Sequence, residues 1–396
     1  MHTRILAAAA ALTSLAPGLL AQVTLPLSDG GSLPDAIHMS GCVCGAHGGT
    51  MVREWLYGGQ ATLAAGDALR EPVTHSGFNI VISPGAGLNA NPTALAAFNA
   101  AASQWEALFS DPVTVTINAD LAPLGPGIIG SASSTILTAG YGAIRGQLVA
   151  DNVGSVTAAV TGALPLAGLG VTAPAAVTSV LPAFTPANAK ALGFGTGAGA
   201  DSSITFSTAF GFDYDNSDGV GAGLTDFQTV ALHEIGHALG FTSGVDFVDG
   251  LLASASSGAV PVMTLDFFRF GSTANPASLG DFSSFARNLT TGGTTHTDLI
   301  NAARGSGPEY FMSTGRQTGD GRQASHWKDN DLSGSLIGVM DPTLGAGQVS
   351  PITAADLNAF DVIGWNVVPE PGEYAAAFGV AALGFAVWRR RGARRA

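Results

Sequence analysis

The 396-residue sequence predicts an α+β fold, because strand and helix patterns both occur along it. A strand, a helix and a second strand are expected in succession within residues 78–118. An alternating stretch at 203–210 then leads into another helix, which ends at Gly240. The composition is 46% hydrophobic and only 11% charged, so a chain of this length can bury a large core.

The first expected strand covers residues 78–82, where a Pro-Gly pair shortly afterwards ends it. A helix is expected from Pro92, because apolar residues recur at spacings of three and four as far as Phe109. An Asp-Pro pair ends this helix. A half-buried second strand follows over 113–118, where Val and Ile alternate with Thr and Asn.

The middle of the chain gives weaker signals. Residues 122–200 are rich in Ala, Gly and Pro, and only one helix is expected there, near 187–192. Residues 203–210 alternate as a strand. Thr225 is the expected N-cap of the next helix and Gly240 its end, since Thr caps helices well and Gly readily takes the conformation that ends them.

That helix carries the motif His233-Glu234-Ile235-Gly236-His237. Residues four apart share one helix face, so both imidazoles can bind one ion while Glu234 reaches a water on the open side of the metal. The pattern is typical of hydrolytic zinc sites, in which the glutamate acts as the general base. The alternative interpretation is two surface histidines beside an incidental glutamate. A catalytic zinc site has three protein ligands, so one more is required.

The residues around this motif resemble the metzincin metalloproteases. The motif and Gly240 match the family pattern, but Ser243 stands where most metzincins place the third ligand. Within Ala-Ser-His-Trp, fourteen residues before Met340, His326 resembles the third ligand of the leishmanolysin-like branch, in which an insertion follows the glycine turn. The candidates for the third ligand are therefore His326, which is preferred, and Asp246, His296 and Glu309.

The resemblance implies a zinc metalloendopeptidase domain over residues 77–366, with a twisted mixed sheet, the zinc-binding helix below it and a mainly helical or irregular C-terminal subdomain. It implies His233, His237 and His326 as ligands of one catalytic Zn²⁺ and Glu234 as the catalytic base. It also implies that Met340 is the Met-turn residue, an apolar floor beneath the imidazoles that does not bind the metal. A polypeptide substrate would bind as an added strand along 203–210, the expected edge of the sheet.

A closing helix is expected after the Met-turn. It begins at Thr353, which with Asp356 forms a capping-box-like start.

The charge balance excludes a nucleic-acid partner. There are 29 acidic against 16 basic residues, a net charge of −13, and a basic face cannot be drawn across the middle of the chain. The sequence has only two cysteines, Cys42 and Cys44, so disulfides do not hold this fold together. Together with His38 and His47 they also allow a latency device or a second metal site, although a small bridge or plain thiols are preferred.

The two chain ends are typical of export signals. Residues 1–21 combine a basic residue, an apolar run and a small residue at the cleavage point, as secretory signal peptides do. Residues 367–396 combine Pro-Glu-Pro, a short apolar span over 374–388 and an Arg cluster, which resembles the PEP-CTERM sorting signal of Gram-negative bacteria. The resemblance implies transient anchoring in the inner membrane, removal of the tail by an exosortase-type enzyme, and a final place on the cell surface or outside the cell. The alternative is a plain tail anchor.

Two further segments leave alternatives open. Residues 22–76 are interpreted as an N-terminal extension or pro-segment. The acidic stretch 213–218 invites a structural Ca²⁺ site, but its spacing misses the EF-hand pattern, so a solvated acidic turn is favoured.

The sequence thus favours an exported zinc endopeptidase. The rival hypothesis is a noncatalytic, zinc-containing protein of the cell surface or extracellular matrix. Hydrolysis of a nonpeptide amide is a third.

Overall fold

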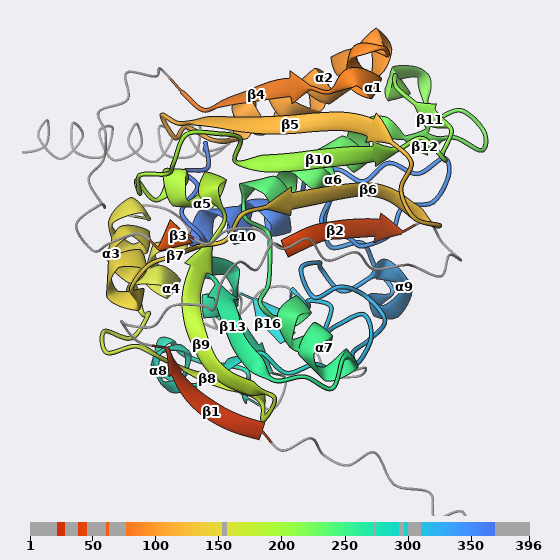
Figure 1. Ribbon diagram of the computed structural model, residues 1–396. Helices are drawn as coiled ribbons and strands as arrows, with labels where there is room; N and C mark the ends of the chain where they lie inside the picture. Colours follow the sequence, from red (N-terminus) through yellow and green to blue (C-terminus); the bar gives the residue numbers. More distant parts are fainter. Residues whose placement is uncertain are drawn as a thin grey trace, which may run out of the picture.

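The computed structural model describes residues 22–27, 39–45, 61–62, 77–152, 157–271, 274–292, 297–299 and 310–368. The expected signal peptide, and the sorting signal beyond residue 368, lie outside these ranges. Helices and strands are mixed, as in an α+β fold. An upper part is built around a five-stranded sheet, and a lower part around smaller sheets (Figure 1). Within the described ranges, no helix combines the length and apolar character that crossing a bilayer requires.

The upper part rests on a twisted mixed sheet with the strand order β2-β6-β10-β5-β4 (Figure 1). In that order the strands span Met39–Gly45, Ile128–Ser134, Ser202–Ser207, Thr114–Ala122 and Asn79–Pro84. Strands β4, β5 and β10 run parallel, whereas β6 pairs antiparallel with β10, and β2 antiparallel with β6. β10 therefore lies in the middle of the sheet.

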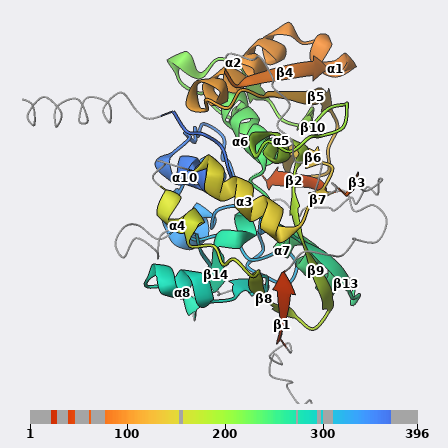
Figure 2. The same ribbon diagram turned by 90° about the vertical axis from the view of Figure 1, so that its left-hand side faces the viewer.

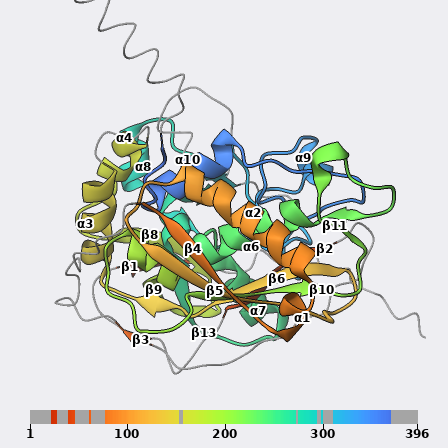
Figure 3. The same ribbon diagram turned by 90° about the horizontal axis from the view of Figure 1, so that it is seen from above.

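Two helices, α2 over Pro92–Leu108 and α6 over Phe227–Leu239, cover one face of this sheet (Figure 3). The indole N–H of Trp105 on α2 donates to the carbonyl of Leu232 on α6 at 3.0 Å. The same indole packs edge-on against Phe360, with ring centroids 4.9 Å apart. Because Phe360 belongs to α10 (Ala354–Val362), one aromatic core joins α2 and α6 to a helix near the C-terminal end of the described residues.

That last helix, α10, spans Ala354–Val362 and begins with the expected capping box. The Thr353 hydroxyl accepts from the Asp356 backbone N–H at 3.4 Å, and the Asp356 carboxylate accepts from the Thr353 N–H at 2.7 Å. Trp365, just beyond the helix, donates its indole N–H to the carbonyl of Leu239 at the end of α6. The closing helix is thereby fixed to the helix that carries the histidine motif.

In the described residues, the lower part contains a sheet of order β13-β9-β7-β3 and another of order β1-β8-β15, beside which lie the short helices α3, α4 and α8 (Figure 2). The strands of these two sheets are β13 (Gly258–Met263), β9 (Val177–Phe184), β7 (Leu137–Thr138), β3 (Ala61–Thr62), β1 (Gln22–Leu27), β8 (Leu169–Pro174) and β15 (Arg287–Asn288). The remaining elements are α1 (Ala86–Asn89), α3 (Tyr141–Asp151), α4 (Ala158–Gly162), α5 (Pro186–Ala191), α7 (Val245–Ala253), α8 (Leu279–Ser284), α9 (Asn330–Ser333), the pairs β11 (Phe212–Asp213) with β12 (Thr225–Asp226) and β14 (Arg269–Gly271) with β16 (Thr297–Leu299), and 3₁₀ turns at Asn216–Asp218 and Thr264–Phe268.

Most of the expected elements are present. The strand, helix and strand of residues 78–118 are β4, α2 and β5, with the short helix α1 between β4 and α2. The helix expected near 187–192 is α5, which is capped by Thr185. The strand expected at 203–210 is β10, which ends at Ser207.

The expected N-cap of α6 is wrong by one residue. Asp226 caps the helix, since its carboxylate accepts from the backbone N–H of Thr229 at 3.0 Å and from its hydroxyl at 2.6 Å. Thr225 is held extended by its pairing with Phe212 in the two-stranded β11-β12 ladder. An acidic side chain at this position also interacts favourably with the helix dipole.

The expectation that β10 forms a sheet edge is also wrong. β6 pairs along one side of β10, and β5 along the other. β6 escaped the sequence analysis because its sequence, Ile-Ile-Gly-Ser-Ala-Ser-Ser, is dominated by small residues of low β-propensity. The strand forms because its neighbours and α6 bury it. β6 separates β10 from that side of the sheet, and β2 is the edge strand there.

Candidate metal centre

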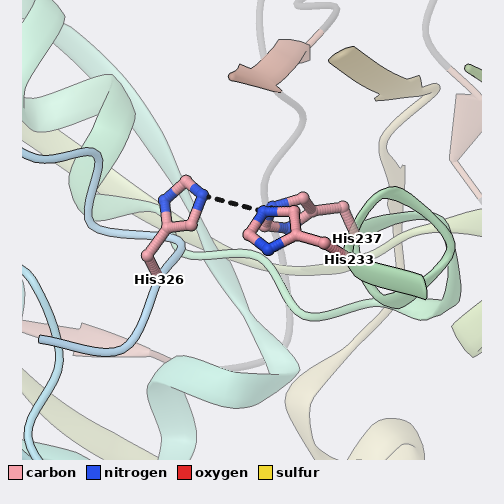
Figure 4. Close-up of side chains that lie close together, drawn as sticks. All are labelled: His233, His237 and His326. Atoms are coloured by element: carbon pink, nitrogen blue, oxygen red, sulfur yellow. Dashed lines mark hydrogen bonds between the residues drawn. The ribbon is translucent and has the colours of Figure 1, made fainter. Parts of the chain in front are cut away.

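Three imidazoles meet at one point of the molecule. His233 and His237 lie one turn apart on α6, and His326 reaches them from an irregular segment 89 residues further along the chain (Figure 4). The Nε2 atoms of His233 and His237 are 2.8 Å apart, and those of His233 and His326 are 3.2 Å apart. A tetrahedral zinc site with bonds of about 2.05 Å places ligand nitrogens about 3.3 Å apart. The trio therefore has the spacing of a ligand set, and it could hold a metal ion.

The outer nitrogens of the rings decide where the protons lie. Nδ1 of His233 lies 2.7 Å from the carbonyl oxygen of Val339, and Nδ1 of His237 lies 2.8 Å from that of Phe241. Nδ1 of His326 lies 3.1 Å from the carbonyl of Gln323. A carbonyl can only accept, so these contacts assign the proton of each neutral ring to Nδ1.

Each Nε2 atom is consequently left with a bare lone pair that points at the other two. The contacts drawn in Figure 4 then join acceptor to acceptor, an arrangement that is repulsive unless a cation lies among the three nitrogens. Backbone carbonyls that fix the tautomer and ring orientation are the usual outer partners of metal-binding histidines. The residues present therefore fit a metal ion.

Burial keeps the rings neutral. The three histidines are almost fully buried, at 2%, 3% and 0% exposure in chain order. Removal from water lowers the pKa of His233 from 6.5 to about 4. The pKa of His237 is lowered well below its ordinary value by burial and by the neighbouring imidazoles, and that of His326 by burial first and then by His233. Neutral imidazoles are the form that binds metal.

The turn after α6 supplies one of the outer contacts. Gly240 ends the helix in the left-handed region, at φ = 120°, where other residues are strained. The chain then reverses, and the Phe241 N–H bonds back to the Gly236 carbonyl at 3.1 Å. This reversal brings the Phe241 carbonyl beneath Nδ1 of His237, so the glycine that ends the helix also orients a ligand.

The side chain of Glu234 lies between its own helix, α6, and the strand β6. Its side chain is fully buried, and the backbone of Gly130 approaches it so closely that a Cβ there would lie 2.5 Å from Oε1. Val230 on α6 would be 2.9 Å from the same Cβ. Only a glycine on β6 therefore leaves room for this carboxylate beside the trio.

Met340 packs against α6 at Gly236. A Cβ at Gly236 would collide with its Sδ atom, so the thioether packs directly on the helix between the two histidines of the motif. Met340 is fully buried, and the preceding residue, Val339, supplies the carbonyl that orients His233. Val339 and Met340 therefore contact α6 in two ways, one through a backbone carbonyl bonded to His233 and the other through a side chain packed on Gly236.

The candidate ligand Asp246, and Ser243 at the position where most metzincins place the third ligand, make other contacts. Ser243 donates its hydroxyl to Asp266 at 2.6 Å, and the Asp246 carboxylate accepts from the backbone N–H groups of Ala324 and Ser325. Neither side chain belongs to the trio. His296 and Glu309 lie outside the described residues.

In the acidic loop, carboxylates accept from nearby backbone N–H groups. Asp213 accepts from Asp215 at 3.1 Å and from Gly221 at 2.8 Å, and Asp215 accepts from Ser217 at 3.2 Å. The hydrogen bonds from Ser217 lower the pKa of the exposed Asp215. These contacts are those of a turn built by Asx side chains.

Two small pockets flank the trio. Ala132, Ser134 and Thr185 line the first pocket together with His237, and Thr229, Leu344 and Asp341 line the second together with His233. Burial raises the pKa of Asp341 to about 6. The first pocket includes the β6 residues nearest to His237, so β6 runs past the trio on the side of Glu234.

The backbone of β2 lies along the outer side of β6. Cys42 stands opposite Ala132 in the register of this pair, and Cys44 opposite Gly130. The two cysteines of the sequence therefore stand at register positions across from the β6 residues that touch the site. His38 and His47 lie outside the described residues.

The sequence analysis missed the parts of the site that are made of small residues and backbone. Gly130 and the carbonyls of Val339 and Phe241 carry no sequence pattern that points to them. A hydrophobic period reveals core positions, but it does not reveal which carbonyl will face a ring nitrogen.

Comparison of the chain with protein-family models, with curated proteins and with solved structures finds no match.

Proposed function

We propose that this chain is an exported zinc-dependent endopeptidase, with His233, His237 and His326 as the ligands of one zinc ion and Glu234 as the general base. The observation that carries the proposal is the meeting of three Nε2 atoms of buried imidazoles, on a helix whose residue Glu234, next to His233 in sequence, is also buried. Three imidazoles with one open position are the ligand set of hydrolytic zinc sites. The metzincin resemblance of the motif, of His326 and of Met340 supports the same assignment.

A zinc ion held there would supply Lewis acidity, which lowers the pKa of water and polarises a carbonyl oxygen. Glu234 would accept a proton from the attacking water on a carboxylate oxygen, and would pass it to the amine nitrogen as the peptide C–N bond breaks. Its complete burial against Gly130 strengthens its electrostatic interactions, because water around it is excluded. The outer hydrogen bonds of the three histidines keep the rings fixed while this proton moves.

The polypeptide substrate would add as an extended strand to β6, which runs past Glu234 and His237. Main-chain hydrogen bonds to a sheet edge hold a chain with little demand on its side chains. In this structure β2, from the segment 22–76, pairs antiparallel with β6 over this stretch. This pairing supports a pro-segment role for β2, because a substrate strand and β2 would compete for the same backbone groups.

The two ends of the chain support the part of the proposal that concerns export and surface location. The expected signal peptide at 1–21 would direct the protein across the inner membrane. The PEP-CTERM-like tail at 367–396 would then be removed by an exosortase-type enzyme. Mass spectrometry of the exported protein tests this part on its own. An intact tail on that protein would contradict it.

The test of the activity is a comparison of wild type with Glu234→Gln on an unfolded protein such as casein, with zinc content measured on both. We expect both proteins to contain one zinc ion, and cleavage to be lost in the variant and in chelator-treated wild type. Zinc-loaded wild type that cleaves no unfolded protein would instead favour the noncatalytic surface protein. If wild type cleaves no peptide but hydrolyses a nonpeptide amide, and Glu234→Gln loses that hydrolysis, the third hypothesis is favoured.

A further inference from the structure

The segment that carries His326 has no helix or strand to place it. Residues 324–329 are irregular apart from a single bridge between Trp327 and Met312. The backbone of this segment is tied by the Ser313 N–H, which donates to the His326 carbonyl at 3.0 Å, and by the Trp327 N–H, which donates to that of Met340. A ligand on such a segment needs further fixed contacts on both sides.

On the N-terminal side of His326 this contact is Asp246. From the first turn of α7, its carboxylate accepts from the N–H of Ala324 at 2.7 Å and from the N–H and hydroxyl of Ser325 at 3.0 and 2.5 Å. The Ser325 hydroxyl in turn accepts from the backbone N–H of Ser243 at 2.9 Å. The residue that stands where metzincins place the third ligand is therefore bonded to the segment that brings His326.

On the C-terminal side the contact is Asp356, which is fully buried in the capping box of α10. Its carboxylate accepts from the indole N–H of Trp327 at 2.7 Å and from the backbone N–H of Val339 at 2.9 Å. Because the Val339 carbonyl orients His233, one carboxylate is bonded both to the neighbour of His326 and to the support of a second ligand.

Two buried carboxylates are costly features. Burying a charge is unfavourable unless hydrogen bonds compensate for the lost water. Burial raises the pKa of Asp356, and it raises that of Asp246 to about 6. The buried guanidinium of Arg269 lies on the same side, where it donates to the Ala324 carbonyl at 3.1 Å and to the Ser243 hydroxyl at 3.3 Å.

We propose that Asp246 and Asp356 are the positioning residues of the metal centre, which together hold His326 in place for the ion that the trio binds. The proposal rests on the trio binding a metal and not on peptidase activity. It assigns to Asp246 a role different from that of a ligand, and to Asp356 a role beyond helix capping.

The experiment measures zinc affinity by chelator competition, and the absorption spectrum of the cobalt-substituted protein, for Asp246→Asn and Asp356→Asn. Asn keeps the size of Asp but turns one acceptor into a donor that faces an N–H group. We expect each variant to weaken zinc binding roughly 10- to 100-fold, the usual effect of losing an outer partner, and to change the cobalt spectrum.

The matched control is Asp249→Asn, on the same helix. Asp249 is also buried and accepts from the backbone N–H of Thr318 at 2.7 Å and of Gln317 at 2.9 Å, so it holds a loop other than the His326 segment. We expect this control to lower the stability of the metal-free protein while leaving zinc affinity within about twofold of wild type.

Milder variants keep the proposal testable if an Asn variant fails to fold. Ser325→Ala removes the hydroxyl that bonds Asp246, and Trp327→Phe removes the indole N–H that bonds Asp356. Thr318→Val is their control, since it removes a hydroxyl that donates to Asp249 at 2.8 Å. The proposal is overturned if the folded Asn variants have the zinc affinity and cobalt spectrum of their control. If the Asn variants do not fold, the same comparison is made for Ser325→Ala and Trp327→Phe. If the proposal is overturned, zinc binding by wild type and its peptidase activity would stand unaffected.

Discussion

Gly130 on β6 lies directly against Glu234 on α6, with space for a hydrogen but not for a methyl group: a Cβ at residue 130 would lie 2.5 Å from Oε1. The two residues are 104 positions apart, and they meet because the main sheet packs on α6. The small residues that hid β6 in the sequence therefore include the glycine that leaves room for the buried carboxylate of Glu234.

Gly130→Ala should displace the Glu234 carboxylate without touching the histidines. A shift of about 1 Å in a catalytic group can cost roughly 100-fold in rate, so we expect a loss of that order in kcat with zinc content unchanged. Gly146→Ala is the control, because a Cβ at this helical position meets nothing within 4 Å. Full activity in Gly130→Ala would show that the carboxylate position is not critical.

Gly236→Ala should destabilise the protein, although alanine favours helices over glycine by about 1 kcal/mol. The added methyl would collide with Sδ of Met340, and overpacking of a filled core costs about 1–3 kcal/mol. Urea unfolding of Gly236→Ala, Met340→Ala and the double variant measures the free energy cost of the added methyl group. We expect the glycine substitution to cost less in the Met340→Ala background, and equal costs in both backgrounds would argue against direct packing.

Val43→Pro should increase activity on unfolded polypeptides several-fold. Val43 pairs with Ser131 of β6, and proline removes a backbone N–H and disrupts the ladder, so β2 should leave the edge of β6 exposed. Val23→Pro, in the separate β1-β8 pair, is the control and should leave the rate unchanged. An unchanged or lower kcat/KM for Val43→Pro, in a protein that still binds zinc, would contradict the competition between β2 and substrate.

In the metal-free protein, His233 should contribute a loss of stability as the pH falls from 6.5 toward 4. The unfolded chain protonates His233 near pH 6.5, whereas burial lowers the pKa of this residue in the folded protein to about 4. Asp246 and Asp341, whose pKa values are raised to about 6, act with the opposite sign, because the folded state binds their protons first as the pH falls.

Comparison with His233→Gln isolates the histidine, since both aspartates are present in both proteins. We expect the free energy of unfolding of wild type to fall more steeply with decreasing pH, by about 1.4 kcal/mol per pH unit, between 6.5 and 4. Urea unfolding in the presence of chelator at pH 6.5, 5.5 and 4.5 gives the slopes. Parallel slopes would mean that His233 is protonated alike in both states.

The elements that could be predicted from the sequence are those with a strong period or a clear cap. α2 has apolar residues at helical spacing, β5 alternates, and the Thr353 and Asp356 pair marks the start of α10. The histidine motif likewise places two imidazoles on one helix face by spacing alone. In each case the information lies within a few neighbouring residues.

The parts that could not be predicted depend on contacts between distant segments. β6 is a strand because β10 and α6 bury it, although its residues favour other structures. Asp226 and not Thr225 is the N-cap because α6 begins at Phe227 and the Asp226 carboxylate reaches the backbone N–H of Thr229. The position of His326 follows from buried hydrogen bonds to Asp246 and Asp356, and sequence spacing does not reveal such partners.

The most direct test of the account is the zinc content and zinc affinity of wild type and His326→Ala. Three imidazoles drawn from two distant segments should bind one ion per chain, and the loss of the third ligand should weaken binding by orders of magnitude while the fold remains. One zinc ion bound to His326→Ala with the affinity of wild type would contradict the central claim that His326 completes the site.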